Sequence, residues 1–429
     1  MFALHETTRR RVCRAAFAVL CIAPTLATMG WVADYWRPGR NKALERELSE
    51  RFAANITLVD VSTPRPDTVR TRLANVFEPA TGELLGGATW VQIKQSGAEQ
   101  RFTISGAAVD VASLEWLARQ TYAWARRLPV GAHELTIKKL SITRGGNAPS
   151  AQPQDGELCL LSDVRVKIQR SGSGAPQLLL TAQASSSVGN APLQLSLAPA
   201  ADSAADSESL ILSLETAGGW IPAETLTPSA WPLADYGSES RFSGAIQWAW
   251  KNSHVHGVAQ GKFEGVDLAN ALPGSSPHVL RGKARIELME LSWDDERIAK
   301  AVGALTAEHA QMSRSLVSSL IRDDGFDCGQ ASDGEPVAGD PSMIALDLLA
   351  LRFQLGADGL TYWGNCPAEL GMHEDCMAVS GRQPLLLAPR VFNWPHGVLI
   401  QSLLGPPTSW VPATREAVEM AGRLPLPLK

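Results

Sequence analysis

The chain has 429 residues, of which 45% are apolar and 19% are charged, and its formal net charge is −5. That length is enough for one large or two medium hydrophobic cores. The small net charge and the lack of a basic stripe give no electrostatic basis for binding nucleic acid. The 13 tryptophans against four tyrosines indicate tryptophans buried in strands, with a few available to line an apolar groove.

The N-terminal segment determines the compartment that we expect. Four arginines precede an uncharged run over residues 15–33: Arg9, Arg10, Arg11 and Arg14. At 1.5 Å per residue, this run comes close to spanning a hydrocarbon layer of about 30 Å. We therefore predict a cytoplasmic segment at residues 1–14 and a transmembrane anchor, or an uncleaved signal, at residues 15–36. A signal peptide cleaved near Ala27 is the alternative, because small residues stand there.

Residues 37–217 are expected to form the first half of an exported β domain. Apolar residues at helical spacing predict a short amphipathic helix at residues 41–52 and a longer helix at residues 111–128, which packs on one end or face of a sheet. Runs with one apolar face predict antiparallel strands at residues 56–61, 68–77, 88–94, 101–105, 135–143, 158–169, 177–184, 193–197 and 210–214.

Residues 218–240, which contain three prolines, are a predicted linker to a C-terminal β region at residues 241–429. Period-two alternation predicts further strands at residues 246–250, 254–263, 281–291, 344–354 and 360–364. A short helix is predicted at residues 397–404. Segments rich in small residues and acids predict loops at residues 198–209 and 323–341.

The C-terminal region contains a series of motifs built from glycines, apolar residues and one Trp-Asp pair: Ser243-Gly244, Gly261-Lys262-Phe263-Glu264-Gly265-Val266-Asp267-Leu268, Leu280-Arg281-Gly282, Trp293-Asp294-Asp295-Glu296-Arg297-Ile298 and Ala301-Val302-Gly303-Ala304-Leu305. This series resembles the C-terminal domain of AsmA-like proteins, the AsmA and TamB type of Gram-negative envelope protein. The order of helix, strand, proline break, strand and Pro-x-Thr-Gly turn over residues 41–83 is similar to the opening of such domains.

The resemblance implies a single-pass protein of the inner membrane whose C-terminal domain lies in the periplasm. The expected fold is mainly β, a large curved antiparallel sheet shaped like a groove or taco, with a few packing helices after one N-terminal transmembrane helix. Its concave apolar face would hold phospholipid or another membrane lipid, with five candidate groove residues: Ile246, Trp248, Trp250, Ile286 and Leu288. A sealed sandwich has the same alternation and is the structural alternative.

The predicted function is envelope or outer-membrane biogenesis without catalysis, by binding or guiding lipid along the groove. Roughly 15 strands at a spacing of about 4.8 Å would make a sheet at most about 70 Å long. That length is short for an unaided bridge between two membranes, which favours action with a partner, as an oligomer or at one membrane only. The alternative is a structural or assembly subunit of a secretion or envelope complex, similar to the type II secretion protein N family. Such a subunit would show an exposed apolar patch or an open edge strand. No enzyme motif is present, and no cofactor is expected.

Export would place four cysteines in an oxidising compartment, where disulfides persist. Three pairings are possible. We predict a local bridge between Cys366 and Cys376, with a second bridge between Cys159 and Cys328 that joins the two halves.

No metal site is predicted. His254 and His256 alternate on one strand, but no third ligand stands near them in the sequence, so a solvated strand face is the simpler interpretation. Asp294 and Asp295 are adjacent and are predicted to occupy a turn between strands rather than to act as an acid-base pair. His309 lacks the motif that surrounds a hydrolase nucleophile.

Overall fold

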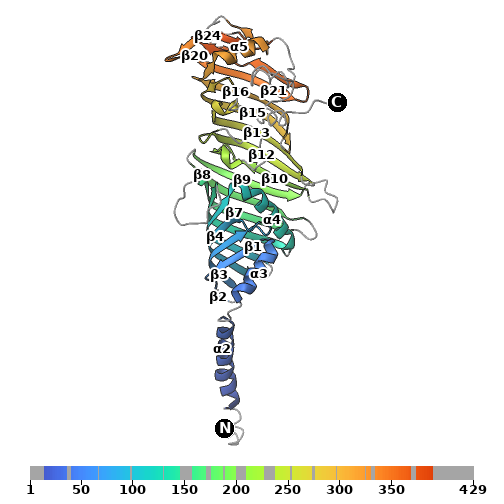
Figure 1. Cartoon of the computed structure of the whole chain (residues 1–429). Coiled ribbons are helices and arrows are strands. Elements are labelled where there is room, and N and C mark those ends of the chain that lie inside the picture. The colour runs from blue at the N-terminus through green and yellow to red at the C-terminus, as the bar shows by residue number, and fades with distance from the viewer. Residues whose placement is uncertain are drawn as a thin grey trace.

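The computed structural model describes residues 14–35, 40–65, 67–96, 99–128, 130–144, 157–170, 175–186, 189–199, 209–226, 237–251, 254–272, 276–295, 297–323, 325–329, 334–368 and 373–389. These residues fold mainly as β structure. Figure 1 shows one long twisted sheet that runs from β2 and β3, next to helix α2, to β24 at the opposite end. The prediction of a mainly β chain with a large antiparallel sheet is confirmed.

Twenty strands form this main sheet. Both β1 (Asn55–Val59) and β2 (Ser62–Arg65) pair with one side of the next strand, β3 (Thr68–Phe77). The order then follows the chain through β4 (Leu84–Ser96), β5 (Glu99–Asp110), β6 (Gly131–Thr143), β7 (Glu157–Arg170), β8 (Gln177–Ser186), β9 (Gly189–Pro199), β10 (Leu210–Glu215), β12 (Arg241–Lys251), β13 (His254–Asp267), β15 (Lys283–Asp294), β16 (Arg297–Glu308) and β21 (Leu348–Gly356).

The far end is completed by short strands, namely β22 (Gly359–Gly364) and β23 (Cys376–Ser380) beside β21, then β24 (Gln383–Leu387) and β18 (Asp327–Cys328). The strand β11 (Ile221–Pro222) pairs with β12 next to β10. A separate small sheet contains β14 (Leu280–Arg281), β17 (Gln311–Ser313), β20 (Asp340–Ala345) and β19 (Glu335–Val337).

Among the described strands, β5 and β6 are the one parallel pair. Parallel neighbours need a crossover connection, and here it consists of η2 (Val111–Ser113) and α4 (Leu114–Arg127). Trp124 of α4 packs on Phe102 of β5 at 5.3 Å and on Phe52 of α3 (Arg40–Phe52) at 5.0 Å between ring centroids. Arg170 of β7 donates to carbonyl oxygens at the end of α4, including that of Arg126 at 2.8 Å. The predicted helices at residues 41–52 and 111–128 are therefore present and pack together on the sheet.

The helical run before the sheet contains a π turn, η1 (Ala18–Ile22), followed by α2 (Ala23–Tyr35). Pro24 has no N–H to continue the α-helical ladder, and the wider turn instead lets the N–H of Ala23 donate to the carbonyl of Ala18. The hydroxyl of Thr25 donates to the carbonyl of Cys21 at 2.6 Å. Within the part of the chain that the structure describes, no helix is both long and apolar enough to cross a membrane.

Along one line across β3 to β7, the alternation of inward and outward side chains shifts by one residue, and we call this line the crease. In β4, the positions that face the apolar interior are Val91 and Ile93 on one side of the crease and Ala88 on the other, so the alternation shifts by one residue. The ladder pairing is interrupted at one aligned row, which we call the crease row: Arg72, Trp90, Ser105, Lys138 and Asp163. Trp90 and Asp163 both have φ of 51°, in the left-handed region. Two consecutive residues on each strand therefore point outward, and the inward positions change parity across the crease while the register stays in step.

Three sets of segments cover this apolar face. The helices α3 and α4 cover the N-terminal strands, and residues 217–226, with β11 and η3 (Ala223–Leu226), cross β7 to β9. The small sheet and α5 (Arg314–Asp323) cover the C-terminal part through Met312, Leu316 and Ile344. Most of the buried apolar residues form one cluster that runs through both halves of the sheet, and a small second cluster of Leu348, Ala350, Cys376 and Val379 lies at the C-terminal end.

The structure shows no break at the predicted linker. β10 and β12 pair directly across it, and Ile221, Ala223 and Leu226 are buried in the core. Residues 227–236 lie outside the described residues. The apolar content of this segment, and not its prolines, determines where it packs.

Several elements differ from the sequence prediction. The predicted strand at residues 344–354 is divided between β20 and β21, which belong to different sheets. The structure adds β16, α5, β23 and β24, and it places β18 and β19 inside the predicted loop at residues 323–341. The predicted helix at residues 397–404 lies outside the described residues.

Candidate functional site: the apolar inner face and its cavity

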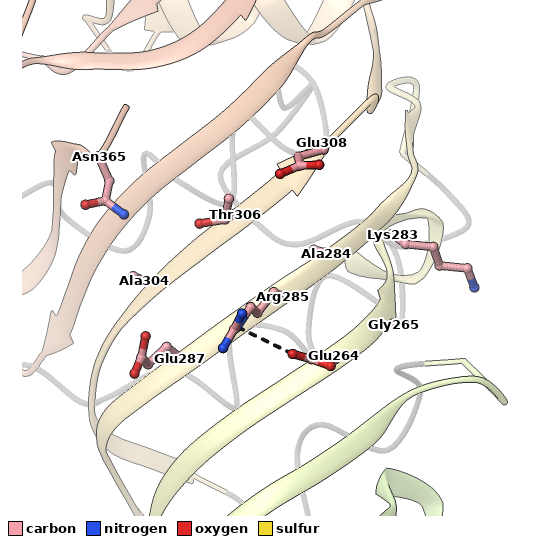
Figure 2. Close-up of a pocket in the computed structure, with 10 residues that line it drawn as sticks. All are labelled: Glu264, Gly265, Lys283, Ala284, Arg285, Glu287, Ala304, Thr306, Glu308 and Asn365. Atoms are coloured by element: carbon pink, nitrogen blue, oxygen red, sulfur yellow. Dashed lines mark ion pairs between the residues drawn. The ribbon is translucent and has the colours of Figure 1, made fainter. Parts of the chain in front are cut away.

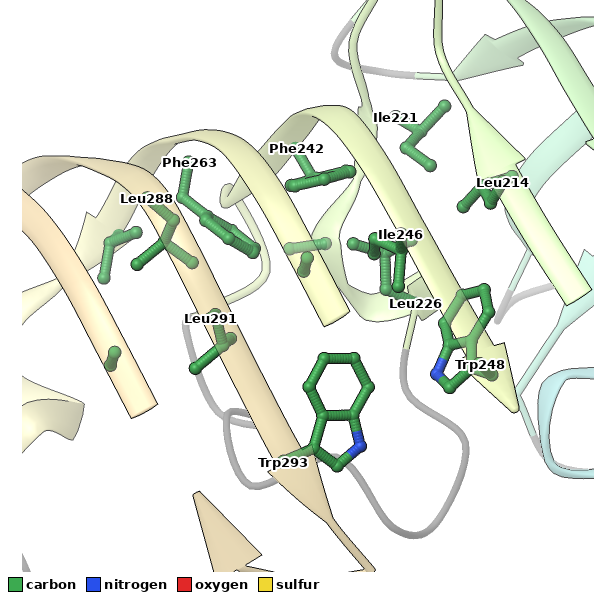
Figure 3. Packing of buried hydrophobic residues seen from close by; sticks show 14 of the residues in the cluster. Leu214, Ile221, Leu226, Phe242, Ile246, Trp248, Phe263, Leu288, Leu291 and Trp293 are labelled. Atoms are coloured by element: carbon green, nitrogen blue, oxygen red, sulfur yellow. The ribbon is translucent and has the colours of Figure 1, made fainter. Parts of the chain in front are cut away.

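The five predicted groove residues all lie on the apolar face, but most of them do not face open space. Ile246, Trp248, Trp250 and Leu288 are between 2% and 7% exposed, and Ile286 is half-buried. Figure 3 shows Ile246, Trp248 and Leu288 gathered with Phe242, Phe263, Leu291 and Trp293 on one side of neighbouring strands. For this part of the sheet, the expectation of an open groove is corrected to a packed core.

Close contacts between side chains of adjacent strands produce this packing. The rings of Phe242 and Phe263 lie 4.9 Å apart. Trp293 lies over Gly257 of the neighbouring strand, where a Cβ atom would come within 1.9 Å of the indole ring. The missing side chain of Gly257 is therefore the space that Trp293 occupies.

An open apolar space remains at the N-terminal end. A cavity of about 230 Å³ lies between α3, α4 and the first strands of the sheet. α3 contributes Leu48 and Phe52, and α4 contributes Trp116. The floor includes Ala74 and Ala88, which are direct partners across β3 and β4. Small side chains in the floor and the shift of alternation at the crease leave the space that the larger side chains do not fill.

Polar contacts at its edges hold α3 over this cavity. The N–H of Ile56 donates to the Ser49 hydroxyl at 3.0 Å, and the N–H of Leu58 donates to the Glu45 carboxylate at 2.8 Å. These two N–H groups belong to β1, so α3 also satisfies the edge of the sheet, which would otherwise be open to strand addition. Arg127 of α4 donates to the carbonyl of Glu50 at the end of α3, at 2.9 Å.

A second hollow of about 580 Å³ lies on the outer face and is polar (Figure 2). Its floor includes Ala304 and Thr306 of β16, and charged side chains of β13 and β15 form its walls. Glu264 forms ion pairs with Arg285 at 3.7 Å and with Arg241 at 2.7 Å. These charges are engaged with one another on a solvated surface.

Two histidine and aspartate pairs lie at the end of the β13 and β15 strands. His254 Nδ1 is 2.8 Å from Asp295 Oδ2, and His256 Nδ1 is 2.7 Å from Asp294 Oδ1. Asp295 is in the predicted turn, with φ of 52°. Among the described residues, no group of three or more His, Cys, Asp or Glu side chains is arranged to hold a metal ion.

The hydrogen bond between His254 and Asp295 is expected to depend on pH. It raises the pKa of His254 and lowers the pKa of Asp295. The charged pair is therefore fully formed when the pH is below the ordinary pKa of histidine and above the pKa of Asp295. It is lost as the pH rises through the raised pKa of His254, and it is also lost when acid protonates Asp295. An NMR titration should give a midpoint for His254 above that of a free histidine. Asp295→Asn should lower that midpoint, whereas Asp294→Asn should leave it in place, and equal effects would contradict the pairing.

The structure brings together one predicted cysteine pair and separates the other. Cys366 and Cys376 have sulfur atoms 2.8 Å apart. The thiol of Cys366 donates to Cys376, which raises the pKa of Cys366 and lowers the pKa of Cys376. The predicted bridge between Cys159 and Cys328 is wrong, because Cys159 is buried in β7 and Cys328 lies in β18 at the far end of the sheet.

No family model, curated protein or solved structure matches this chain. The likeness to AsmA-like proteins is therefore an expectation from sequence motifs, and the function is argued from the geometry.

Proposed function

We propose that this chain is an AsmA-like protein of envelope biogenesis that binds an acyl chain of a membrane lipid in the cavity under α3 and α4. In this proposal the N-terminal helix anchors the chain in the inner membrane, and the sheet lies in the periplasm. The observation that carries the proposal is the apolar cavity of about 230 Å³.

A cavity of this size requires an explanation, because protein interiors are close-packed. An apolar cavity of about 150 Å³ is already large enough to bind benzene. Each methylene group transferred from water into such a site contributes about 0.8 kcal/mol. An alkyl chain therefore fits both the volume and the apolar lining, to which Thr71, Gln120 and Thr121 add the few polar groups.

The position of the cavity fits a supply of lipid from the anchored end. It lies at the end of the sheet next to α2 (Figure 1). The helical run from residue 14 to residue 35 would be roughly 33 Å long, and it exposes Phe17, Leu20, Leu26 and Met29. Apolar side chains exposed around a helix are typical of a segment that another apolar phase covers. This supports the anchor as part of the proposal.

Beyond the cavity, the inner face is filled by its own side chains. Passage of lipid along the sheet would require the covering segments, such as residues 217–226, to move away. The proposal is therefore binding of a chain at the anchored end, with guidance along the sheet as a further step that needs this opening.

The test is native mass spectrometry with lipid extraction on the full chain, purified from membranes in mild detergent. We expect the unaltered protein to retain lipid and Ala88→Phe to reduce the occupancy at least about tenfold, because the added ring removes space for two or more methylene groups. Ile286→Phe enlarges another inner-face residue outside the cavity and should retain lipid. An unaltered protein without lipid, or equal loss in both folded variants, would refute the proposal.

One observation favours the alternative of an assembly subunit. Among the described strands, β22 pairs only with β21, and Trp363 of β22 is 37% exposed. An edge of this kind is a site where a partner strand can add. If no lipid is found in the experiment above, Trp363→Lys in a reconstituted envelope or secretion complex would test this edge, with loss of assembly as the expected result.

A further inference from the structure

The outer face of β3 to β7 has an excess of exposed positive charge. Six cations on this face form no ion pair within the described chain, and together with Trp90 we call them the basic face: Arg70, Lys94, Lys138, Lys139, Arg165 and Lys167. The strand registers bring them together, since Lys94, Arg101, Glu134 and Lys167 follow one another across β4 to β7. Two acids also lie on this face: Glu134 is paired with Arg101 at 3.5 Å, and the exposed Asp163 follows Lys138 on the crease row. The patch extends about 20 Å across the strands at about 4.8 Å each.

The outer face of the C-terminal half shows the contrast. There five cations have partners of opposite charge, as in Lys262 with Glu287 at 3.1 Å and Lys300 with Glu290 at 2.6 Å, whereas Lys251, Arg297 and Arg352 form no ion pair within the described chain. The chain as a whole has a net charge of −5. The basic face therefore has more cations without an ion pair than the C-terminal strands have, although the chain as a whole is acidic.

Trp90 lies on the crease row within the basic face. Its side chain is 64% exposed, and its φ of 51° is unusual for a bulky residue. Arg72 lies opposite Trp90 on β3, and Lys138 lies two strands away on the same row. An exposed tryptophan with cations of this kind nearby has the composition of a binding hot spot.

We infer that the basic face docks an acidic segment of a partner protein, with Trp90 packed against an apolar side chain of that segment. Charge complementarity selects an acidic partner. A lipid surface fits less well, because α2 continues along the long axis of the sheet (Figure 1), so a membrane around α2 would meet the end of the sheet and not this face. The choice of a protein over a lipid surface rests on the anchor of the proposed function, whereas binding of an acidic segment does not depend on the cavity or on its lipid.

The test is binding of a fluorescently labelled peptide to the full chain in non-ionic detergent, measured by fluorescence anisotropy. The peptide consists of glutamate and glycine residues with one leucine at its centre. We expect salt-dependent binding that weakens at least about tenfold in K138E/K139E/R165E. K262E/K283E/K300E, which makes the same change in charge on the C-terminal half, should change the affinity less than about twofold. Trp90→Ala should weaken binding of the leucine peptide roughly tenfold. The same variant should not change the affinity for a control peptide in which alanine replaces the central leucine.

Two results would overturn the inference. One is equal weakening by both triple variants, which would show that only net charge matters. The other is loss of peptide binding when phosphatidylglycerol is mixed into the micelles, which would show that anionic lipid occupies the surface. Unchanged binding in the mixed micelles supports the protein partner.

Discussion

Trp293→Ala is expected to lower the free energy of unfolding by about 3–5 kcal/mol. The indole is 1% exposed and fills the space above Gly257, where no side chain of the neighbouring strand can replace it. Its removal leaves a cavity between β13 and β15, the two strands that it joins. A urea titration followed by circular dichroism would measure the loss.

Trp90→Ala is the matched control, because the same atoms are removed from a side chain that is 64% exposed. We expect a change within about 0.5 kcal/mol there. Gly257→Ala provides the complementary test, since its new Cβ would meet the Trp293 ring, and overpacking of this kind costs about 1–3 kcal/mol. A loss below about 1 kcal/mol for Trp293→Ala would contradict the described packing.

Alternation in the sequence predicted the strand faces well. Ile246, Trp248 and Trp250 lie on the apolar face, as their period of two indicates. In β15, the alternation that includes Leu288 ends at a bulge, after which Leu291 and Trp293 face the interior. A bulge shifts the alternation by one residue, and pattern analysis that assumes a constant period does not locate it.

What covers each face could not be predicted from alternation alone. An apolar strand face has the same pattern in an open groove and in a sealed core. Residues 217–226 close part of the inner face through contacts with β7 and β8, which lie earlier in the sequence, and α5 packs on β17 and β20. Loops and short helices of this kind have no periodicity that identifies their partner.

The cavity was missed for a similar reason. The amphipathic helices were predicted, but the space beneath them depends on the facing Ala74 and Ala88 and on the crease. A search for paired alanines on neighbouring predicted strands would have given a signal. The basic face was also missed, because Lys94, Lys138 and Arg165 are dispersed in the sequence and come to the same face of neighbouring strands only through the strand registers.

Oxidation of Cys366 and Cys376 to a disulfide is expected to stabilise the C-terminal end of the sheet by about 2–3 kcal/mol, because it closes a loop of about ten residues in the unfolded chain. The sulfur atoms are already 2.8 Å apart. The N–H groups of Asn365 and Cys366 both donate to the carbonyl of Cys376, so the backbone on either side of the pair is held as well. Little rearrangement is needed to form the bond.

Tryptic mapping without reduction gives a direct measurement, since residues 353–382 contain both cysteines and no internal Lys or Arg. An intramolecular disulfide lowers the mass of this peptide by the two thiol hydrogens. C366S/C376S should match the reduced protein in stability, and C159S/C328S should keep the full effect of oxidation, because those two residues lie at opposite parts of the sheet. A disulfide that maps to Cys159 would contradict the strand order, because β7 is distant from β18 and β23, and a disulfide between Cys328 and either Cys366 or Cys376 would contradict the pairing.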